Sequence, residues 1–291
     1  MRSSGVLMHI SSLPSPYGIG TMGKEARKFV DFLDKSGQKY WQILPICPTS
    51  YGDSPYQSFS SFAGNPYFIS LEDLIEEKLL TREECESCDW GGSESYVDYE
   101  KMYMSRYKLL RKAYERSDFL KDKDYEIFLK EEKNWLTDYC LFMAIKNSQK
   151  GICWIDWPDE LKDRHSKAVK EAEKELETEI NFYRFQQYCF TTQWRKLKKY
   201  ANKKGISIIG DVPIYVALDS SDAWANPEML QFDKDHNPKS VAGCPPDAFS
   251  ATGQLWGNPL YDWKKLKASG YDWWVQRMKH CLELYDVVRI D

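Results

Sequence analysis

Short apolar runs and one amphipathic segment alternate at the start of the chain. Residues 5–10 form an apolar run between turn residues, which predicts a strand. Residues 24–36 carry apolar side chains at helical spacing, and Gly37 follows as a stop signal. Residues 40–46 form a second apolar run. A strand, a helix and a strand at this spacing indicate a βαβ unit, and therefore a parallel sheet.

The middle of the chain has helical periodicity and is rich in Lys and Glu. Residues 167–178 are mostly Ala, Lys, Glu and Leu, with Glu and Lys spaced for pairing along one helix. We interpret this charge run as a solvated helix face. The pattern predicts a helical insertion at residues 81–185, between barrel elements at residues 1–80 and 186–291.

The alternation of strands and helices returns after this segment. Residues 190–203 predict an amphipathic helix, residues 206–212 a fully buried strand, residues 273–284 a helix, and residues 285–291 a second buried strand. About four parallel strands with intervening helices are half of an eight-stranded barrel. The predicted fold class is therefore α/β, with about the first half of a (β/α)8 TIM barrel present.

Two of the predicted strands end in a carboxylate, Asp211 and Asp291. An aspartate in this position commonly caps the next helix, and that interpretation is favoured for either residue alone. Side chains at the carboxyl ends of neighbouring barrel strands point into one mouth, where active sites lie. Arg289 projects to the same side as Asp291 and could keep it ionised. Enzymes that cleave or transfer glycosides commonly use a pair of carboxyl groups, so the pattern favours an enzyme acting on sugars.

Composition excludes some classes of protein and mildly favours carbohydrate binding. The net charge of -4 does not indicate nucleic-acid binding, and no apolar run is long enough to cross a membrane. The start of the chain lacks the pattern of a signal peptide. Aromatic residues make up 15% of the chain, which suits stacking on sugar rings, although core packing accounts for most tryptophans in any protein.

The 8 cysteines are scattered rather than concentrated, which predicts reduced thiols in a cytoplasmic protein. Cys85 and Cys88 form a lone CxxC pair. A zinc site would need a second ligand pair, so we interpret the spacing as coincidence, with metal or redox chemistry as the minority alternative.

Two loops rich in Gly, Pro and aromatic residues follow predicted strands, at residues 51–58 and 242–259. Such loops form the mouth of a barrel, and their Gly and Pro residues indicate defined backbone shapes. Several motifs in these loops and strands occur in one order along the chain: His9–Pro14, Ser54–Ser60, Gly64–Tyr67, Gly210–Val216, Gly243–Asp247, Gln254–Pro259 and Val288–Asp291.

In these motifs the chain resembles the amylomaltase family of 4-α-glucanotransferases, from His9 to its last residue. The resemblance implies an α-amylase-type (β/α)8 barrel with helical insertions. It also implies transfer of α-1,4-glucan segments between maltooligosaccharides with retention at the anomeric carbon, without a metal or organic cofactor.

The resemblance also implies roles for individual residues. Asp291 would be the nucleophile, Arg289 would hold and polarise it, and Asp211 would bind the sugar beside the scissile bond. The remaining contacts would come from loops: Tyr56, Trp256 and Asn258 would touch sugar rings, and Asp247 would lie in a loop over the site. His9 is left out, because a lone histidine on a strand is more often structural.

The sequence leaves two other functions open, namely a different α-amylase-superfamily hydrolase and a non-catalytic glucan-binding fragment. The acid/base Glu and a transition-state-stabilising Asp that the family uses are assigned to no residue here. We expect the chain to be the front part of a larger enzyme. Half a barrel has an open parallel edge, so the chain alone is expected to fold poorly and to be inactive.

Overall fold

The computed structural model describes residues 2–50 and 52–291, and its centre is a parallel sheet of four strands. The strands are β1 (Gly5–Leu7), β2 (Tyr40–Gln42), β3 (Ser207–Val212) and β6 (Val287–Ile290), paired in the order β1-β2-β3-β6. All three pairings are parallel, as the apolar runs predicted. The register places Asp211 of β3 directly opposite Arg289 of β6.

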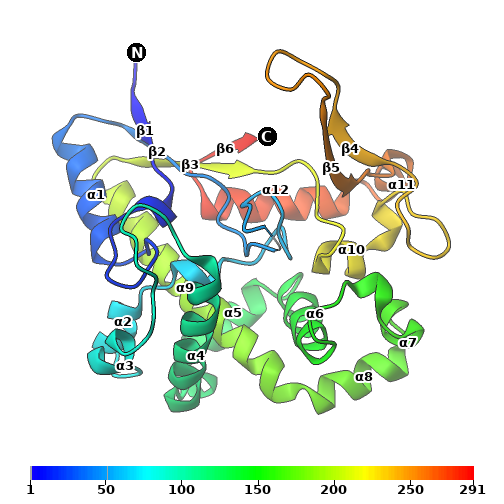
Figure 1. The fold of residues 1–291 in the computed structure, drawn as a ribbon, viewed down its shortest axis with the longest axis horizontal. Coiled ribbons are helices and arrows are strands. Elements are labelled where there is room, and N and C mark those ends of the chain that lie inside the picture. The colour runs from blue at the N-terminus through cyan, green and yellow to red at the C-terminus, as the bar shows by residue number, and fades with distance from the viewer. Residues whose placement is uncertain (1, 51) are drawn as a thin grey trace.

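Three long helices cover one face of this sheet: α1 (Lys24–Lys35), α9 (Glu177–Lys203) and α12 (Asp272–Leu284), seen below the strands in Figure 1. The core lies between these helices and the sheet, where Trp41 and Ile208 have no exposed surface. Each helix contributes an apolar stripe to that core, which is how amphipathic helices pack in α/β folds.

The prediction that residues 285–291 form a buried strand is wrong. Val287 is 42% exposed and Ile290 is 53% exposed, although both are apolar. The reason is that β6 lies at one end of the sheet and pairs only with β3. A parallel strand is buried when neighbours cover both its edges and both its faces, and β6 has only part of this cover.

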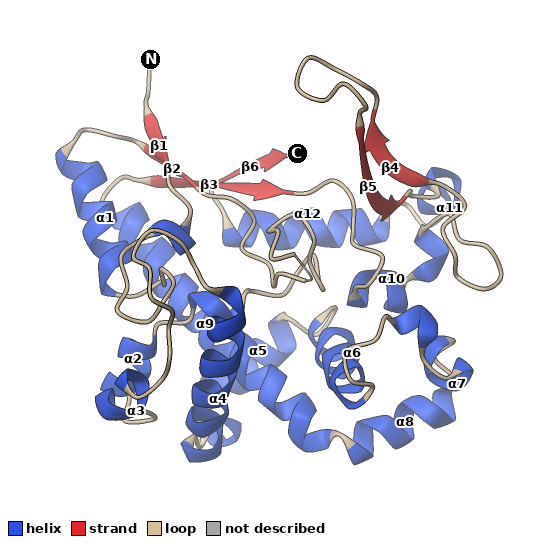
Figure 2. Ribbon diagram, viewed as in Figure 1, coloured by secondary structure: helices blue, strands red, loops and turns tan. Residues whose placement is uncertain are grey.

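The helical middle of the chain lies on the side of α9 away from the sheet (Figures 1 and 2). Its α-helices are α2 (Leu71–Glu76), α3 (Arg82–Glu86), α4 (Tyr99–Arg116), α5 (Lys123–Glu131), α6 (Leu136–Ser148), α7 (Asp159–Lys162) and α8 (Ser166–Glu175). Short 3-10 turns connect several of these elements, at η1 (Ile10–Ser12), η2 (Pro66–Phe68), η3 (Phe119–Lys121) and η4 (Trp154–Asp156).

Helix α9 belongs to both parts of the molecule. It is longer than the predicted helix at 190–203, because its first half already packs against α4 and α6. Further along the helix, the Gln187 and Gln193 side chains bond the backbone of Gly64 and Ser70, and the Trp194 indole donates to the Leu284 carbonyl. The proposed boundary between residues 185 and 186 therefore falls inside one continuous helix, and the domain division stays a prediction.

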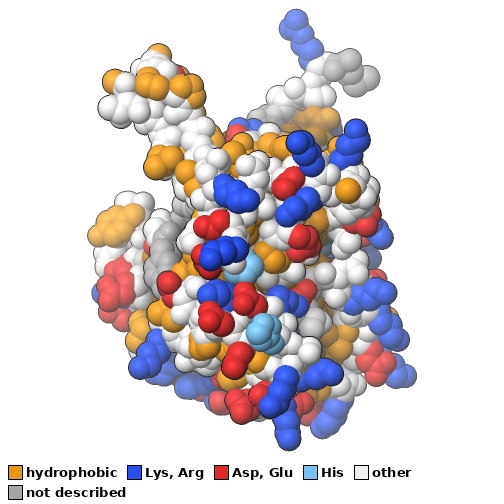
Figure 3. Space-filling view, turned by 90° about the vertical axis from the view of Figure 1, so that its right-hand side faces the viewer, with side chains coloured by type: hydrophobic (Ala, Val, Ile, Leu, Met, Phe, Trp, Pro, Cys, Tyr) orange, Lys and Arg blue, Asp and Glu red, His pale blue; other side chains and the backbone are white. Residues whose placement is uncertain are grey.

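Residues 242–259 are not simply a loop. Strands β4 (Val241–Cys244) and β5 (Gln254–Pro259) form an antiparallel hairpin that rises from the molecule (Figure 1). In Figure 3 this hairpin stands clear of the body as a lobe bearing hydrophobic side chains. The remaining elements, α10 (Ser221–Ala225), η5 (Pro227–Met229) and α11 (Trp263–Ala268), lie around its base.

A buried carboxyl group joins α10 to the segment before Gly64. Asp222 is 5% exposed, and its Oδ2 accepts a 2.6 Å hydrogen bond from the Ser61 N–H. Burial raises the pKa of Asp222 to about 6, although the Ser61 bond and the positive charge of Arg277 act in the opposite direction. An acid with a raised pKa favours the folded state when protonated and destabilises it when ionised.

We expect Asp222→Asn to stabilise the protein at neutral pH, because the variant removes a buried ionised group and keeps an oxygen for Ser61. The wild type is destabilised as pH rises from about 4 through about 6, because the buried Asp222 then ionises. The full loss in its free energy of unfolding is about 2–3 kcal/mol. The measurement is chemical unfolding of both proteins at about pH 4 and about pH 7.5, with the advantage of the variant appearing only at the higher pH. An equal difference at both pH values would contradict the assignment.

Candidate functional site

The candidate site begins at the end of β3, where the chain places a carboxylate on the sheet edge. Gly210 precedes Asp211, and a Cβ at this glycine would lie 2.2 Å from the Tyr285 ring. The strand therefore passes close to that ring, and Asp211 ends up only 2% exposed. Its buried charge needs partners, since an isolated carboxylate in this position would be strongly unfavourable.

Two residues from distant parts of the sequence supply those partners. The Tyr56 hydroxyl donates a 2.8 Å hydrogen bond to Asp211 Oδ2. Arg289 Nη1 lies 2.8 Å from each carboxylate oxygen of Asp211. Hydrogen bonds between ionised groups of this kind are short and strong, so the three side chains hold one another in place.

Arg289 connects this buried carboxylate to the exposed one at the end of β6. Its Nη2 donates to Asp291 Oδ1, so one guanidinium bridges both acids. The Asp291 N–H donates to the Val212 carbonyl, and the Ile214 N–H donates to the Asp291 carbonyl, each at 2.9 Å. Backbone bonds on both sides therefore fix Asp291 beside the strand that carries Asp211.

The electrostatics of this network follow from its two acids and one base. Burial, followed by the hydrogen bond to Asp211, raises the pKa of Tyr56 to about 12. The charge of Asp211, and then that of Asp291, raises the pKa of Arg289. Tyr56 is therefore a hydrogen-bond donor and Arg289 a cation throughout the neutral range.

Asn258 lies next to this network but is itself buried. Its Nδ2 donates to the Val216 carbonyl at 2.9 Å, and its Oδ1 accepts a 2.8 Å bond from Gln57 Nε2. The Gln57 amide also reaches the Trp256 carbonyl at 3.4 Å. Gln57 therefore joins the loop of Tyr56 to the base of the hairpin, a role that we did not predict from the sequence. Its position beside Tyr56 was the only signal.

The other two predicted residues lie on the hairpin. The Trp256 side chain is 45% exposed, with its indole N–H 3.0 Å from Gln254 Oε1. Asp247 Oδ1 accepts 2.8 Å bonds from the N–H groups of Phe249 and Ser250. Among residues 2–50 and 52–291, the hydrogen-bond partners of Asp247 are all in its own loop, so it does not join the network of Tyr56, Asp211, Arg289 and Asp291.

A second feature near the site was also missed by sequence reasoning. A cavity of about 750 Å³ opens between the loop at residues 48–53 and the helical region. Tyrosines dominate its wall, namely Tyr67, Tyr99, Tyr103, Tyr107 and Tyr183. Tyr51 of the predicted mouth loop lies outside the described residues. The helical periodicity of the middle of the chain gave no reason to place these tyrosines around one cavity.

Residues 2–50 and 52–291 contain neither a group of metal ligands nor a membrane-spanning helix. Within that part of the chain, no group of three or more His, Cys, Asp or Glu side chains is arranged to hold a metal ion. Cys85 is buried at α3 and Cys88 is partly buried, both as free thiols. Nor is any helix there long and apolar enough to cross a membrane.

Several known proteins are similar in sequence to this chain. A 4-alpha-glucanotransferase of Clostridium butyricum is 52% identical over 98% of this chain, and one of Thermus thermophilus is 46% identical over all of it. The chain spans 58% of the length of each of these relatives.

Solved structures give the same result for the fold. An amylomaltase of Streptococcus agalactiae in complex with acarbose is 44% identical and superposes with a TM-score of 0.96, over all of this chain and 59% of that protein. An amylomaltase of Corynebacterium glutamicum, at 21% identity, has a TM-score of 0.76 over 99% of this chain and 40% of its own, which shows the shared fold. The four strands and their helices are thus part of a (β/α)8 barrel.

The sequence profile of one family matches residues 8–291, which is nearly the whole chain. That match includes every residue of the network around Asp211. The protein belongs to the 4-alpha-glucanotransferase family.

Proposed function

We propose that this chain supplies the nucleophile-bearing part of a retaining 4-α-glucanotransferase that moves α-1,4-glucan segments between maltooligosaccharides. The observation that carries the proposal is the bridge from buried Asp211 through Arg289 to exposed Asp291, at the carboxyl ends of neighbouring parallel strands. That end of a barrel sheet is where catalytic side chains lie.

In the proposed mechanism, the Asp291 carboxylate attacks the anomeric carbon as the glycosidic bond breaks. A second carboxyl group protonates the leaving oxygen, and a retaining enzyme holds the two groups about 5–5.5 Å apart. That acid is assigned to no residue of this chain. An acceptor sugar hydroxyl then displaces Asp291 and returns a proton, so that one glycosidic bond is broken and one is formed.

The other residues position the sugar and the nucleophile. Arg289 orients Asp291, because it offers a fixed pair of donors to the two acids. Tyr56 and Asp211 form the floor on which a glucosyl unit would lie. Trp256 offers an exposed indole face, and the tyrosine-lined cavity would accept a further stretch of glucan.

Transfer instead of hydrolysis requires that an acceptor sugar reach the covalent intermediate before water does. The hairpin carries Phe249, which is 97% exposed, and Leu255, which is 81% exposed. Such apolar side chains at the entrance favour a sugar over water, and Asp247 stabilises the loop that presents them. We also propose a cytoplasmic location, which the eight free thiols support.

The test is a fusion protein in which residues 1–291 are followed by the part of the Clostridium butyricum relative that extends beyond the matched segment. Incubation with maltotriose is expected to yield glucose together with oligosaccharides longer than the substrate. The unfused chain serves as the control. Formation of glucose and maltose alone would indicate hydrolysis and would contradict the transferase assignment.

A further inference from the structure

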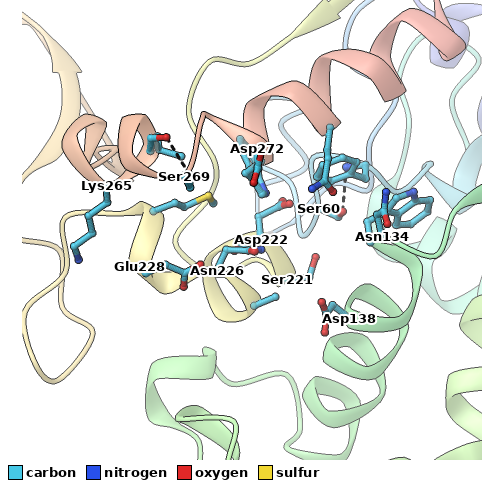
Figure 4. A pocket seen from close by; sticks show the side chains of 17 residues that line it. Ser60, Asn134, Asp138, Ser221, Asp222, Asn226, Glu228, Lys265, Ser269 and Asp272 are labelled. Atoms are coloured by element: carbon cyan, nitrogen blue, oxygen red, sulfur yellow. Dashed lines mark hydrogen bonds between the residues drawn. The ribbon is translucent and has the colours of Figure 1, made fainter.

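A separate cavity of about 290 Å³ lies between the amino ends of α6 and α12 (Figure 4). Helices α10 and α11 close its other sides. Tyr56, Asp211, Arg289 and Asp291 do not line it, so it is distinct from the catalytic network. Its volume is at the small end of ligand-binding pockets, which suits one hexose ring better than a longer chain.

The floor of the cavity carries a carboxylate acceptor. Asp222, which Figure 4 labels, is 5% exposed, and its Oδ2 accepts a 2.6 Å hydrogen bond from the Ser61 N–H. A carboxylate offers about four acceptor positions, so Asp222 can accept a sugar hydroxyl in addition to the Ser61 N–H.

The walls combine flat rings with amide groups. Trp135 and Trp273 both line the cavity, and Phe62 lies between them, nearly parallel to Trp135 at 6.2 Å and perpendicular to Trp273 at 5.9 Å. The Asn226 and Gln276 amides supply both donors and acceptors. A sugar has C–H faces that pack against aromatic rings and hydroxyl groups that hydrogen-bond to amides. The lining of this cavity therefore matches a sugar.

The charges of the lining exclude other classes of ligand. Asp138, Glu228 and Asp272 line the cavity against a single Lys265, so a phosphate or another anion would be repelled. Asp138 is already paired with Arg164 at 2.6 Å. No metal-binding group was found in the described part of the chain, so the carboxylates are not arranged around a cation.

We propose that this cavity binds a single glucosyl unit, as the terminal residue of an α-glucan or as maltose, at a site remote from catalysis. The choice of glucose over other neutral sugars rests on the proposed function. Asp222 accepts a sugar hydroxyl, Gln276 bonds a second, and Trp273 packs against the ring. Because the Ser221 N–H also bonds the Phe59 carbonyl at 2.8 Å, the site adjoins the loop that carries Tyr56.

The experiment uses the fusion protein labelled with 5-fluorotryptophan and follows the signals of Trp135, Trp256 and Trp273 by fluorine NMR during a maltose titration. Signals are assigned with Trp→Phe variants. The Trp135 and Trp273 signals are expected to shift together and to saturate with a Kd of about 1 mM, as suits a ligand with few contacts. Inorganic phosphate at the same concentrations is expected to leave them unchanged.

The matched variants lie on the same helix. Gln276→Ala removes an exposed side chain that lines the cavity, and it is expected to weaken binding about 3–10-fold through one lost hydrogen bond. Lys279→Ala changes an exposed residue outside the cavity and is expected to leave binding unchanged. Equal affinities for the wild type and Gln276→Ala would overturn the proposal.

The Trp256 signal separates this site from the proposed catalytic site. A response of Trp256 alone would overturn the cavity proposal and leave the proposed function intact. A saturable response of Trp135 and Trp273 with an unchanged Trp256 would support the cavity and count against sugar binding at the catalytic network. No response from any of the three would overturn the cavity proposal as well.

Discussion

Asp291→Asn, introduced into the fusion protein, is expected to lower kcat for maltotriose disproportionation by at least about 10³-fold, because the reaction loses its nucleophile. An asparagine in this position still accepts from Arg289, so the geometry of the network is retained. The measurement is the initial rate of glucose release and of longer-oligosaccharide formation, followed in the same reaction.

Asp235→Asn is the matched control for Asp291→Asn. It makes the same change of charge at an exposed turn, and its rate is expected to equal that of the wild type. A direct test is also available, since a fluorinated glycosyl donor that traps the covalent intermediate should label a peptide containing Asp291. Full activity of Asp291→Asn, or a label on another carboxylate, would remove the basis of the mechanism.

Arg289→Gln is expected to lower kcat by about 10²-fold, with a smaller change in KM, because it removes the charge that orients the nucleophile. The measurement is kcat and KM for maltotriose disproportionation by the fusion protein and by its Arg289→Gln variant.

Arg289→Lys separates charge from geometry at the same position. Lysine keeps the positive charge, but its single ammonium cannot contact both oxygens of Asp211 and also reach Asp291, as Nη1 and Nη2 of Arg289 do. We therefore expect the kcat of Arg289→Lys to stay low although the charge is retained. A kcat of Arg289→Gln equal to that of the wild type would show that Arg289 does not orient the nucleophile.

The strands and helices that could be predicted were those with a strong local pattern. Residues 24–36 show a helical stripe, and residues 206–212 are rich in Ile and Val, so both elements were predicted nearly as they occur. The β4–β5 hairpin was missed because its strands contain Gly and Pro and expose Leu255 and Trp256, which breaks the apolar and polar alternation typical of strands.

The same distinction applies to the site. Asp211 and Asp291 could be predicted because each follows an apolar run, and the carboxyl ends of parallel strands share one edge of a sheet. The role of Gln57 could not be predicted, because its partners Trp256 and Asn258 are about 200 residues away in the sequence. Only the folded chain brings the three residues together. The exposure of β6 depends on what flanks it, which the composition of the strand does not specify.

The span of α9 limits how this fold can be redesigned. A helical region inserted into a barrel is often treated as an exchangeable module that can be shortened or swapped. Here the single helix α9 packs against the helical region through the buried Phe182 and Phe185. It also hydrogen-bonds the segments beside the sheet through Gln187 and Trp194. A minimal version of the protein would therefore have to retain residues 177–203 whole and make its cuts upstream of them.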